Sequence, residues 1–336
     1  MFYATVRRLC SAGVASQVMK GQSTSDSQLE PFLKFLREKN ALFDAVEVRP
    51  SPETGRGLFS KCVIQEGSLV ASVPLETLSV SAERLLAASP TLQAMKPPTF
   101  DDVRRVMAAR SVRDAALYEQ VYLALLVAGE HLNPDSPLNR YFNLLPHPAM
   151  DDALVIRRHK ETLDPMLLVE WDDYQKEFLA ILHILLKKWG PQAPPIEVAY
   201  WAFRTVLSRM HLLPHKGMAP EDVGSSLNYT ALTVFDEADR QTRWTKRIKT
   251  MLGMALGNIN AAQEFYLVPT LVPLIDMTGH LPSSNVQVEV HKRKGLGSCV
   301  ELQAVRLIEK GEEIGLRYNT SQSPAFLMYR FGFIPQ

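Results

Sequence analysis

The chain has 336 residues, of which 46% are hydrophobic and 22% are charged, a composition that is ordinary for a folded globular protein and excludes a chain disordered throughout. Lysine and arginine (37) nearly balance aspartate and glutamate (36), so no overall field would draw the chain to nucleic acid or to an anionic membrane. The three cysteines, Cys10, Cys62 and Cys299, lie too far apart in sequence to suggest a disulfide framework, and they form no C-x-x-C zinc motif. No apolar run reaches the length of a membrane span, so we expect no membrane segment.

The N-terminal segment, residues 1–27, carries Arg7, Arg8 and Lys20 ahead of its first acidic residue, Asp26, and contains several serines and threonines. This composition favours a mitochondrial transit peptide, and the alternative is a disordered tail that carries no address. We therefore expect a mitochondrial location, or a cytoplasmic one if the segment is only a tail.

Beyond this segment, apolar spacing predicts a short helix over residues 29–39, followed by strands within residues 43–74. From residue 82 to about residue 260 the apolar period is helical. The clearest helices within that stretch are predicted at residues 118–132, 166–189, 198–212 and 243–256.

Strands return near the C-terminus, at residues 286–290, 299–306 and 314–318, before a short helix at 324–329. Because each β segment is too small to bury a core alone, the two segments should pair into one body. The predicted fold is therefore α+β, a split and mostly β domain with a long α-helical insertion. The predicted boundaries are 1–27 for the N-terminal segment, 28–97 for the first β part, 98–262 for the helical insert and 263–336 for the second β part.

Two segments carry candidate binding chemistry. Residues 55–59 read G-R-G-L-F, but these glycines lead into a strand rather than a helix, so a tight hairpin turn is a simpler interpretation than a phosphate cradle. Farther along, an apolar run at residues 271–275 is followed by two polar residues, Asp276 and His280. The pair could be metal ligands or a capping turn, and because no third ligand stands at a matching spacing, we expect no metal site.

A third segment, I-E-K-G-E-E-I at residues 308–314, precedes Tyr318 and a late G-F pair at residues 332–333. The order of these motifs on either side of a helical insert resembles that of the SET-domain protein methyltransferases. The long insert resembles the Rubisco large-subunit methyltransferase branch of that family. So do S-P-L-N-R-Y-F-N-L-L-P at 136–146, W-A-F-R-T-V-L-S-R at 201–209 and D-M-T-G-H at 276–280.

The resemblance covers residues 29–333 and implies a methyltransferase that uses S-adenosylmethionine, needs no metal and acts on a lysine side chain of a protein substrate. Histidine is a second acceptor known in this branch. Related enzymes carry a further C-terminal domain that binds the protein substrate, and we expect this chain to lack it, which leaves substrate choice to the helical insert or to a partner protein.

The resemblance also implies roles for individual residues. Ser208 and Arg209 would flank the substrate channel, Asp276 would orient Arg209 or the substrate, and the hydroxyl of Tyr318 would lie at the point of methyl transfer as the catalytic group. The residues implied in cofactor binding are Thr54, Gly55, Arg56, Gly279, His280, Tyr318 and Phe333.

Two positions depart from the family pattern. Gly279 stands where the family has an asparagine that binds the amino-acid end of the cofactor, and losing such a bond costs about 1–3 kcal/mol. Pro324 stands where an asparagine often follows the tyrosine. These departures support a second hypothesis, a catalytically inactive SET-fold protein that acts as a structural or assembly factor in a larger complex, which the N-terminal segment would locate in mitochondria.

Two weaker signals remain. Ser208, His211 and Asp276 could be drawn as a hydrolytic triad, but no nucleophile elbow supports it. The basic cluster at residues 240–249 is typical of a solvated helix face, and it is where RNA or an acidic partner would bind if one does. Its charged members are Arg240, Arg243, Lys246, Arg247 and Lys249.

Overall fold

The computed structural model describes residues 26–51, 55–110, 112, 115–146, 164–216, 265–318 and 323–333. Nearly all of the predicted N-terminal segment, the helix expected at 243–256 and the basic cluster at 240–249 lie outside the described residues. The expectations for those segments therefore stay predictions.

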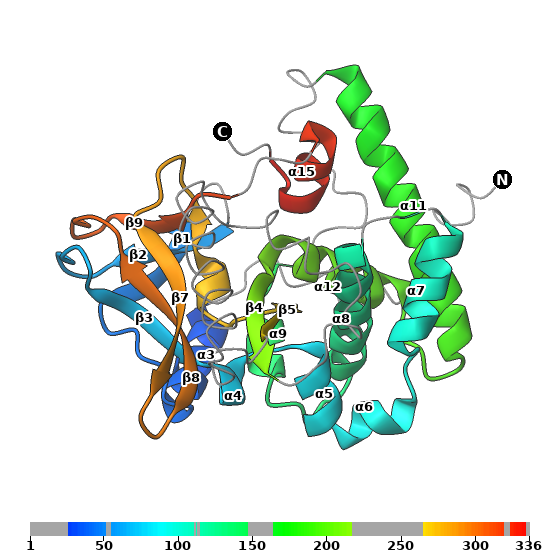
Figure 1. The fold of residues 1–336 in the computed structure, drawn as a ribbon, viewed down its shortest axis with the longest axis horizontal. Coiled ribbons are helices and arrows are strands. Elements are labelled where there is room, and N and C mark those ends of the chain that lie inside the picture. The colour runs from blue at the N-terminus through cyan, green and yellow to red at the C-terminus, as the bar shows by residue number, and fades with distance from the viewer. Residues whose placement is uncertain are drawn as a thin grey trace, which may run out of the picture.

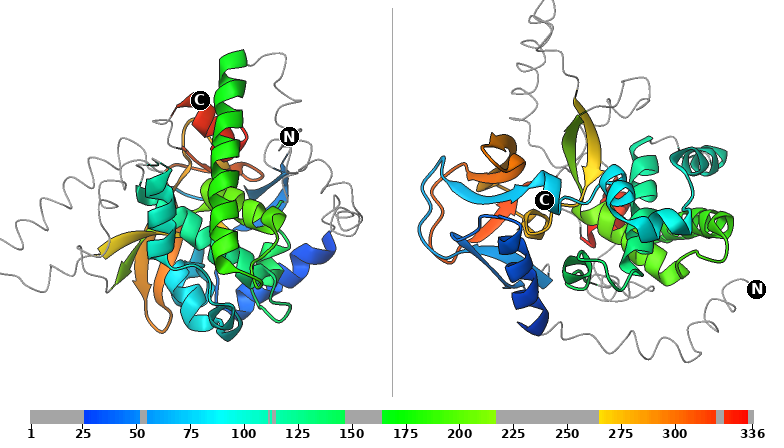
Figure 2. Two further views of the ribbon diagram at one scale, coloured as in Figure 1. Left: turned by 90° about the vertical axis from the view of Figure 1, so that its right-hand side faces the viewer. Right: turned by 90° about the horizontal axis from the view of Figure 1, so that it is seen from below.

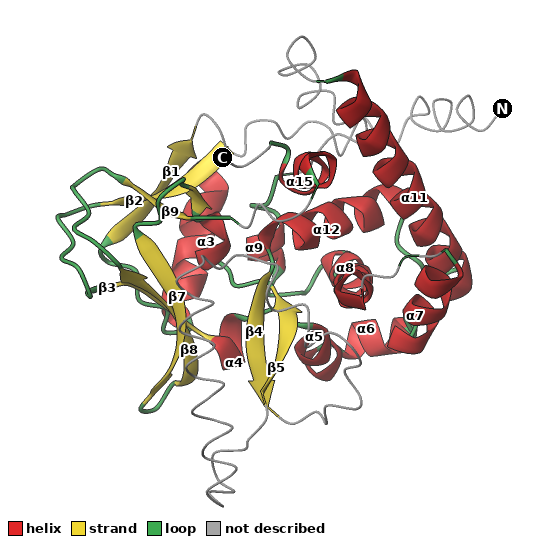
Figure 3. Ribbon diagram, turned by 45° about the horizontal axis from the view of Figure 1, so that its top comes forward, coloured by secondary structure: helices red, strands yellow, loops and turns green. Residues whose placement is uncertain are grey.

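β1–β3 and β7–β9 gather on one side of the molecule and most of the helices on the other, while β4 and β5 lie beside the helices in the middle (Figures 1 and 3). One sheet has the order β1-β2-β9-β6, a second β3-β8-β7, and a third consists of β4 and β5. The strands are β1 Val46–Ser51, β2 Gly55–Ser60, β3 Leu69–Pro74, β4 His211–Lys216, β5 Phe265–Thr270, β6 Gly279–His280, β7 Val286–Arg293, β8 Gly297–Ala304 and β9 Glu313–Leu316.

Strands from the two ends of the chain pair with one another. β2 pairs antiparallel with β9, with Leu58 opposite Ile314, and β3 pairs antiparallel with β8. β6 runs parallel to β9, with Gly279 opposite Gly315. The two β segments, which flank the helical insertion in sequence, therefore form one body, and the predicted α+β fold is confirmed.

The helices begin and end at recognisable signals. For example, α11 has Pro165 in its first turn and Asp164 as its N-cap, and it stops before Gly190, whose φ of +86° lies in the left-handed region. The helices are α3 Asp26–Glu38, α4 Leu75–Leu78, α5 Ala82–Ala88, α6 Pro90–Met95, α7 Phe100–Ala109, α8 Ala115–His131, α9 Asn139–Phe142, α11 Pro165–Trp189, α12 Ile196–Arg209, α15 Pro324–Phe331 and the short 3₁₀ helix η3 Ile275–Met277.

One local prediction was wrong. The helix expected over residues 198–212 ends at Arg209, because His211 starts β4, which pairs with β5 more than fifty residues later in the chain. The tight hairpin expected at the glycine motif is confirmed by the antiparallel pairing of β1 with β2, in which Ser51 lies opposite Gly55, and the glycines lead into β2 as predicted.

The C-terminal helix α15 packs against α11 and α12 (Figures 1 and 2). Tyr329 is fully buried and stacks on Phe178 at a ring-centroid distance of 5.7 Å, while the Arg204 guanidinium lies 4.5 Å from the Tyr329 ring. This packing places Phe331, the last residue of α15, and Phe333 beside Tyr318, two residues after the end of β9. Within the described residues, no helix combines the length and the apolar character that crossing a bilayer requires.

Candidate active site

A small cavity lies where the end of α12, η3 and the residues after β9 meet. Its volume is about 20 Å³, which is room for about one water molecule. Its walls bring together four residues that the sequence analysis assigned to the site from three separate segments, Ser208, Arg209, Asp276 and Tyr318. The complete lining is Ser208, Arg209, Met210, His211, Asp276, Thr278, Tyr318 and Phe331.

Tyr318 is held by hydrogen bonds at both ends. Its hydroxyl donates to the carbonyl oxygen of Thr278 at 2.7 Å, and its backbone N–H donates to Nδ1 of His280 at 3.0 Å. Burial raises the pKa of Tyr318 to about 12, so the side chain stays a neutral phenol at physiological pH. The ring is further fixed by Phe331, whose centroid is 4.8 Å away.

Asp276 joins the helical insert to the β body. Its side chain is fully buried, and its Oδ2 accepts a hydrogen bond from the Tyr141 hydroxyl at 2.7 Å. Nη1 of Arg209 lies 3.5 Å from the same oxygen and donates to the Asp276 carbonyl at 3.0 Å. Burial raises the pKa of Asp276, while Arg209 and Tyr141 oppose that rise. The expected pairing of Asp276 with Arg209 is therefore present, and Tyr141 is a partner that the sequence analysis did not name.

Two buried polar atoms on residues of the cavity wall have no hydrogen-bond partner within the described part of the chain, Oδ1 of Asp276 and Nδ1 of His211. Burial, with a smaller contribution from the Arg330 charge, lowers the pKa of His211 to about 4, so its imidazole is neutral. A cavity with unsatisfied polar atoms and room for one small group suits a water molecule or a hydrogen-bonding head group.

The hydrolytic triad is not formed. Ser208 directs its hydroxyl back onto its own helix, where it donates to the Arg204 carbonyl at 2.8 Å. His211 lines the same cavity, but no hydrogen bond joins it to Ser208 in the described structure. His211, which the sequence suggested only as a member of that triad, is instead a wall residue, and the strand that turns it inward depends on pairing with a distant segment.

The residues expected to hold the cofactor lie around the same strand ends. The ring of His280 contacts those of Tyr318 and Phe333 at centroid distances of 5.3 and 5.9 Å. β2 and β9 are antiparallel, with Leu58 opposite Ile314. Gly55, three residues before Leu58 at the start of β2, therefore lies near the end of β9 that leads to Tyr318. Together, the strand ends and these rings gather around Tyr318.

Two further cofactor residues have different outcomes. Nη1 of Arg56 donates to the carbonyl of Leu144 at 3.2 Å, so this side chain ties β2 to the helical insert. Thr54 lies outside the described residues.

Glu313 explains the glycine at position 279. A Cβ atom added to Gly279 would lie 2.8 Å from Oε1 of Glu313, and one added to Gly57 would lie 2.7 Å from the same oxygen. The carboxylate thus occupies the space beside both glycines. The asparagine that the family has at position 279 would fit only if Glu313 moved.

Pro324 also has a structural reason. It occupies the first turn of α15, where its missing N–H costs no hydrogen bond, and the Ser323 side chain accepts from the Phe326 N–H at 3.2 Å. Pro324 therefore begins the helix whose last residue, Phe331, lies in the cavity wall.

Neither the family models nor the curated proteins compared with this chain give a significant match. Solved structures do match its fold. The SET domain of LSMT, the Rubisco large-subunit methyltransferase, bound to lysine and AdoHcy has a TM-score of 0.54 and 15% identity, covering 93% of this chain and 58% of that chain. Its complex with methyllysine and AdoHcy has a TM-score of 0.53 and 17% identity, covering 91% of this chain and 56% of that chain.

Rubisco LSMT bound to AdoMet gives a TM-score of 0.53 at 16% identity, again covering 91% of this chain and 56% of that chain. This chain thus spans less than two thirds of the length of the structures that it matches. The chain therefore has a SET-domain fold of the type found in Rubisco large-subunit methyltransferase.

Proposed function

We infer that the chain is an S-adenosylmethionine-dependent protein-lysine N-methyltransferase that acts on a non-histone protein. The observation that carries this proposal is the single cavity at which Tyr318, Arg209 and Asp276 meet from separate parts of the chain. The SET fold and the ligands of its structural neighbours support the same reaction, since those structures contain AdoMet or AdoHcy, and two of them contain lysine or methyllysine.

The residues around the cavity fit a positively charged cofactor. The ring centroids of Tyr318, Phe331 and Phe333 lie 4.8 to 6.3 Å from one another beside the cavity. Ring faces favour a cation. We assign cofactor binding to the start of β2, to β6 and to Phe333; when bound, S-adenosylmethionine would supply a methyl group on a positively charged sulfur.

The chain's own groups would orient the acceptor. Because the Tyr318 hydroxyl hydrogen is donated to Thr278, its oxygen is left to accept a hydrogen bond from the N–H of an amine and hold that nitrogen on axis, which is catalysis by positioning. Arg209 compensates the charge of Asp276, so the cavity does not strongly favour an ammonium ion. Burial of the amine then favours its uncharged, nucleophilic form.

Radiolabelled methyl transfer into proteins of a cell extract tests the proposal. The natural chain should label a protein, and Tyr318→Phe should lower the labelling rate by about tenfold or more, the kinetic equivalent of one hydrogen bond. Tyr118→Phe is the matched control, because the Tyr118 hydroxyl also donates to a backbone carbonyl, that of Val112, away from the cavity. Undiminished labelling by Tyr318→Phe would remove the tyrosine from its assigned role.

One observation favours the second hypothesis of an inactive assembly factor. A cavity of about 20 Å³ accepts one small group, and Phe331 and Tyr318 would have to move apart to admit a lysine side chain. A chain that binds neither S-adenosylmethionine nor S-adenosylhomocysteine would support the assembly role and contradict the methyltransferase role.

A further inference from the structure

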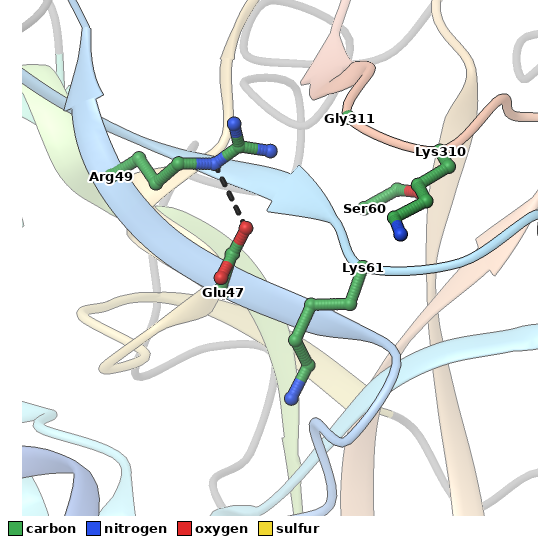
Figure 4. Close-up of a pocket in the computed structure, with 6 residues that line it drawn as sticks. All are labelled: Glu47, Arg49, Ser60, Lys61, Lys310 and Gly311. Atoms are coloured by element: carbon green, nitrogen blue, oxygen red, sulfur yellow. Dashed lines mark ion pairs between the residues drawn. The ribbon is translucent and has the colours of Figure 1, made fainter.

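A second and larger pocket lies on the β body and shares no lining residue with the cavity at Tyr318 (its lining is drawn in Figure 4). Its volume is about 480 Å³. It is formed by β1, by the end of β2 and by the turn before β9, segments that are far apart in sequence. The lining residues are Glu47, Arg49, Ser60, Lys61, Lys310 and Gly311.

The pocket carries an excess of positive charge. Arg49, Lys61 and Lys310 each come from a different segment, and only Glu47 among the lining residues is acidic. Glu47 pairs with Arg49 at 3.0 Å between Oε1 and Nε, and no described carboxylate forms an ion pair with Lys61 or Lys310. Of the nearby carboxylates on the β9 side, Glu312 is already paired with Arg306. The pocket therefore complements an anionic group.

The position of Arg49 is set before any ligand arrives. Its guanidinium lies 4.6 Å from the centroid of the Phe59 ring, and its Nε forms an ion pair with Oε1 of Glu47 at 3.0 Å but makes no hydrogen bond within the described residues. Its Nη2 would lie 3.9 Å from a Cβ added to Gly311, whose φ of +83° favours glycine. A held guanidinium loses less conformational entropy on binding than a free one does.

The floor of the pocket is rigid as well. The Ser60 hydroxyl is buried and bonded to the carbonyls of Cys62 and Glu309, at 2.5 and 3.0 Å. Its backbone carbonyl accepts from the Gly311 N–H at 2.8 Å, and its N–H donates to the Glu312 carbonyl at 2.9 Å. These bonds tie the end of β2 to the turn before β9, so the basic groups stand on a fixed frame.

Exposed apolar side chains lie next to this frame in sequence and in space. Val63, Leu307 and Val305 are 49%, 43% and 37% exposed, and they flank the point at which Ile64 pairs with Ile308. Such side chains suit a protein partner better than a nucleic acid. The Arg49 guanidinium over Phe59 also competes with a base for the face of that ring.

We propose that this basic pocket, together with Val63, Val305 and Leu307, docks an acidic and partly apolar segment of a partner protein. The proposal does not depend on methyl transfer, because the surface would serve a methylation substrate or an assembly partner equally well. Opposite charge sets the approach and orientation of the segment, and the apolar contacts add affinity.

Fluorescence anisotropy of the full-length chain tests the proposal with a labelled heptapeptide in which three glutamates alternate with leucine and valine. The variant Lys61→Glu/Lys310→Glu should bind this peptide about tenfold or more weakly at low salt, since two attractions become repulsions. The matched control, Lys292→Glu/Lys294→Glu, changes the net charge equally at exposed residues around the β7–β8 turn, and it should bind like the natural chain.

Two comparison probes identify the ligand class. A peptide with glutamine in place of glutamate should bind weakly, and an RNA oligonucleotide of equal charge should bind less tightly than the acidic peptide. Equal losses in both double variants, unchanged binding in Lys61→Glu/Lys310→Glu, or preferred binding of RNA would each overturn the proposal. Matching thermal unfolding curves for the two double variants ensure that lost binding does not reflect lost folding.

Discussion

The hydrogen bond between Tyr141 and Asp276 joins residues 135 positions apart and links the helical insert to the candidate site. Tyr141→Phe removes its hydroxyl and leaves the Asp276 carboxylate buried, with Oδ1 unpartnered in the described structure and Arg209 still 3.5 Å from Oδ2. Leaving a buried acceptor unsatisfied costs about 1–3 kcal/mol. We expect the free energy of unfolding to fall by that amount.

Urea denaturation followed by circular dichroism at pH 7 measures this loss, with Tyr118→Phe as the control. The Tyr118 hydroxyl bonds to the carbonyl of Val112 and is only partly buried, so water can replace it and the loss should stay below about 1 kcal/mol. Equal or smaller destabilisation by Tyr141→Phe than by Tyr118→Phe would refute the reasoning.

A double-mutant cycle isolates the contact itself. In an Asp276→Asn background the hydroxyl faces an amide in place of a carboxyl group, so the effect of Tyr141→Phe should change by about 0.5 kcal/mol or more, as is usual for residues in direct contact. Strict additivity of the two substitutions would mean that the Tyr141–Asp276 bond does not contribute to stability in solution.

Three further predictions concern stability. Burial lowers the pKa of His211 to about 4, so the unfolded chain binds a proton at this residue more readily than the folded one below pH 6.5. The free energy of unfolding should therefore fall by about 3 kcal/mol between pH 6.5 and pH 4 on account of His211, and His211→Gln should flatten the curve of that free energy against pH. Parallel curves for the natural chain and the variant would contradict this. The hydrogen bond from Lys188, 2.8 Å away, lowers the pKa of Asp102 to about 2, so Asp102→Asn should lower the free energy of unfolding by about 2 kcal/mol at pH 7. The difference in that free energy between the natural chain and the variant should narrow as the pH falls below 4. A difference that stays constant with pH would mean that the Asp102 charge is not its cause. Gly57→Ala should cost no more than about 1 kcal/mol in urea denaturation, because the Cβ would meet the Glu313 carboxylate, the end of a flexible side chain that can turn aside; a loss near the upper end of the usual overpacking range, about 3 kcal/mol, would contradict this.

Local sequence signals predicted the elements that end on local chemistry. The helix expected at residues 166–189 is found as α11, because Pro165 and Gly190 mark its ends without help from the rest of the chain. The helix expected at 198–212 is too long, because β4 owes its form to pairing with β5. Periodicity reports the local preference of a segment and carries no information about a strand partner more than fifty residues away.

The candidate site divides in the same way. Motif order was enough to associate Tyr318 with Asp276 and Arg209, since each belongs to a recognisable segment. Tyr141 stands in the 136–146 motif and His211 was weighed in a hydrolytic triad, but neither pattern indicated the contact that each makes at the site, because those contacts depend on tertiary packing. The Glu313 carboxylate that lies beside both Gly57 and Gly279 comes from a third segment, and only coordinates reveal it.

The proposed function requires that two distant β segments meet to form a binding site for a sulfonium cofactor and its product. Calorimetric titration of the full-length chain with S-adenosylmethionine and S-adenosylhomocysteine tests that claim most directly. We predict saturable binding of both with dissociation constants in the micromolar range, whereas no detectable heat at millimolar concentrations of either compound would contradict the claim.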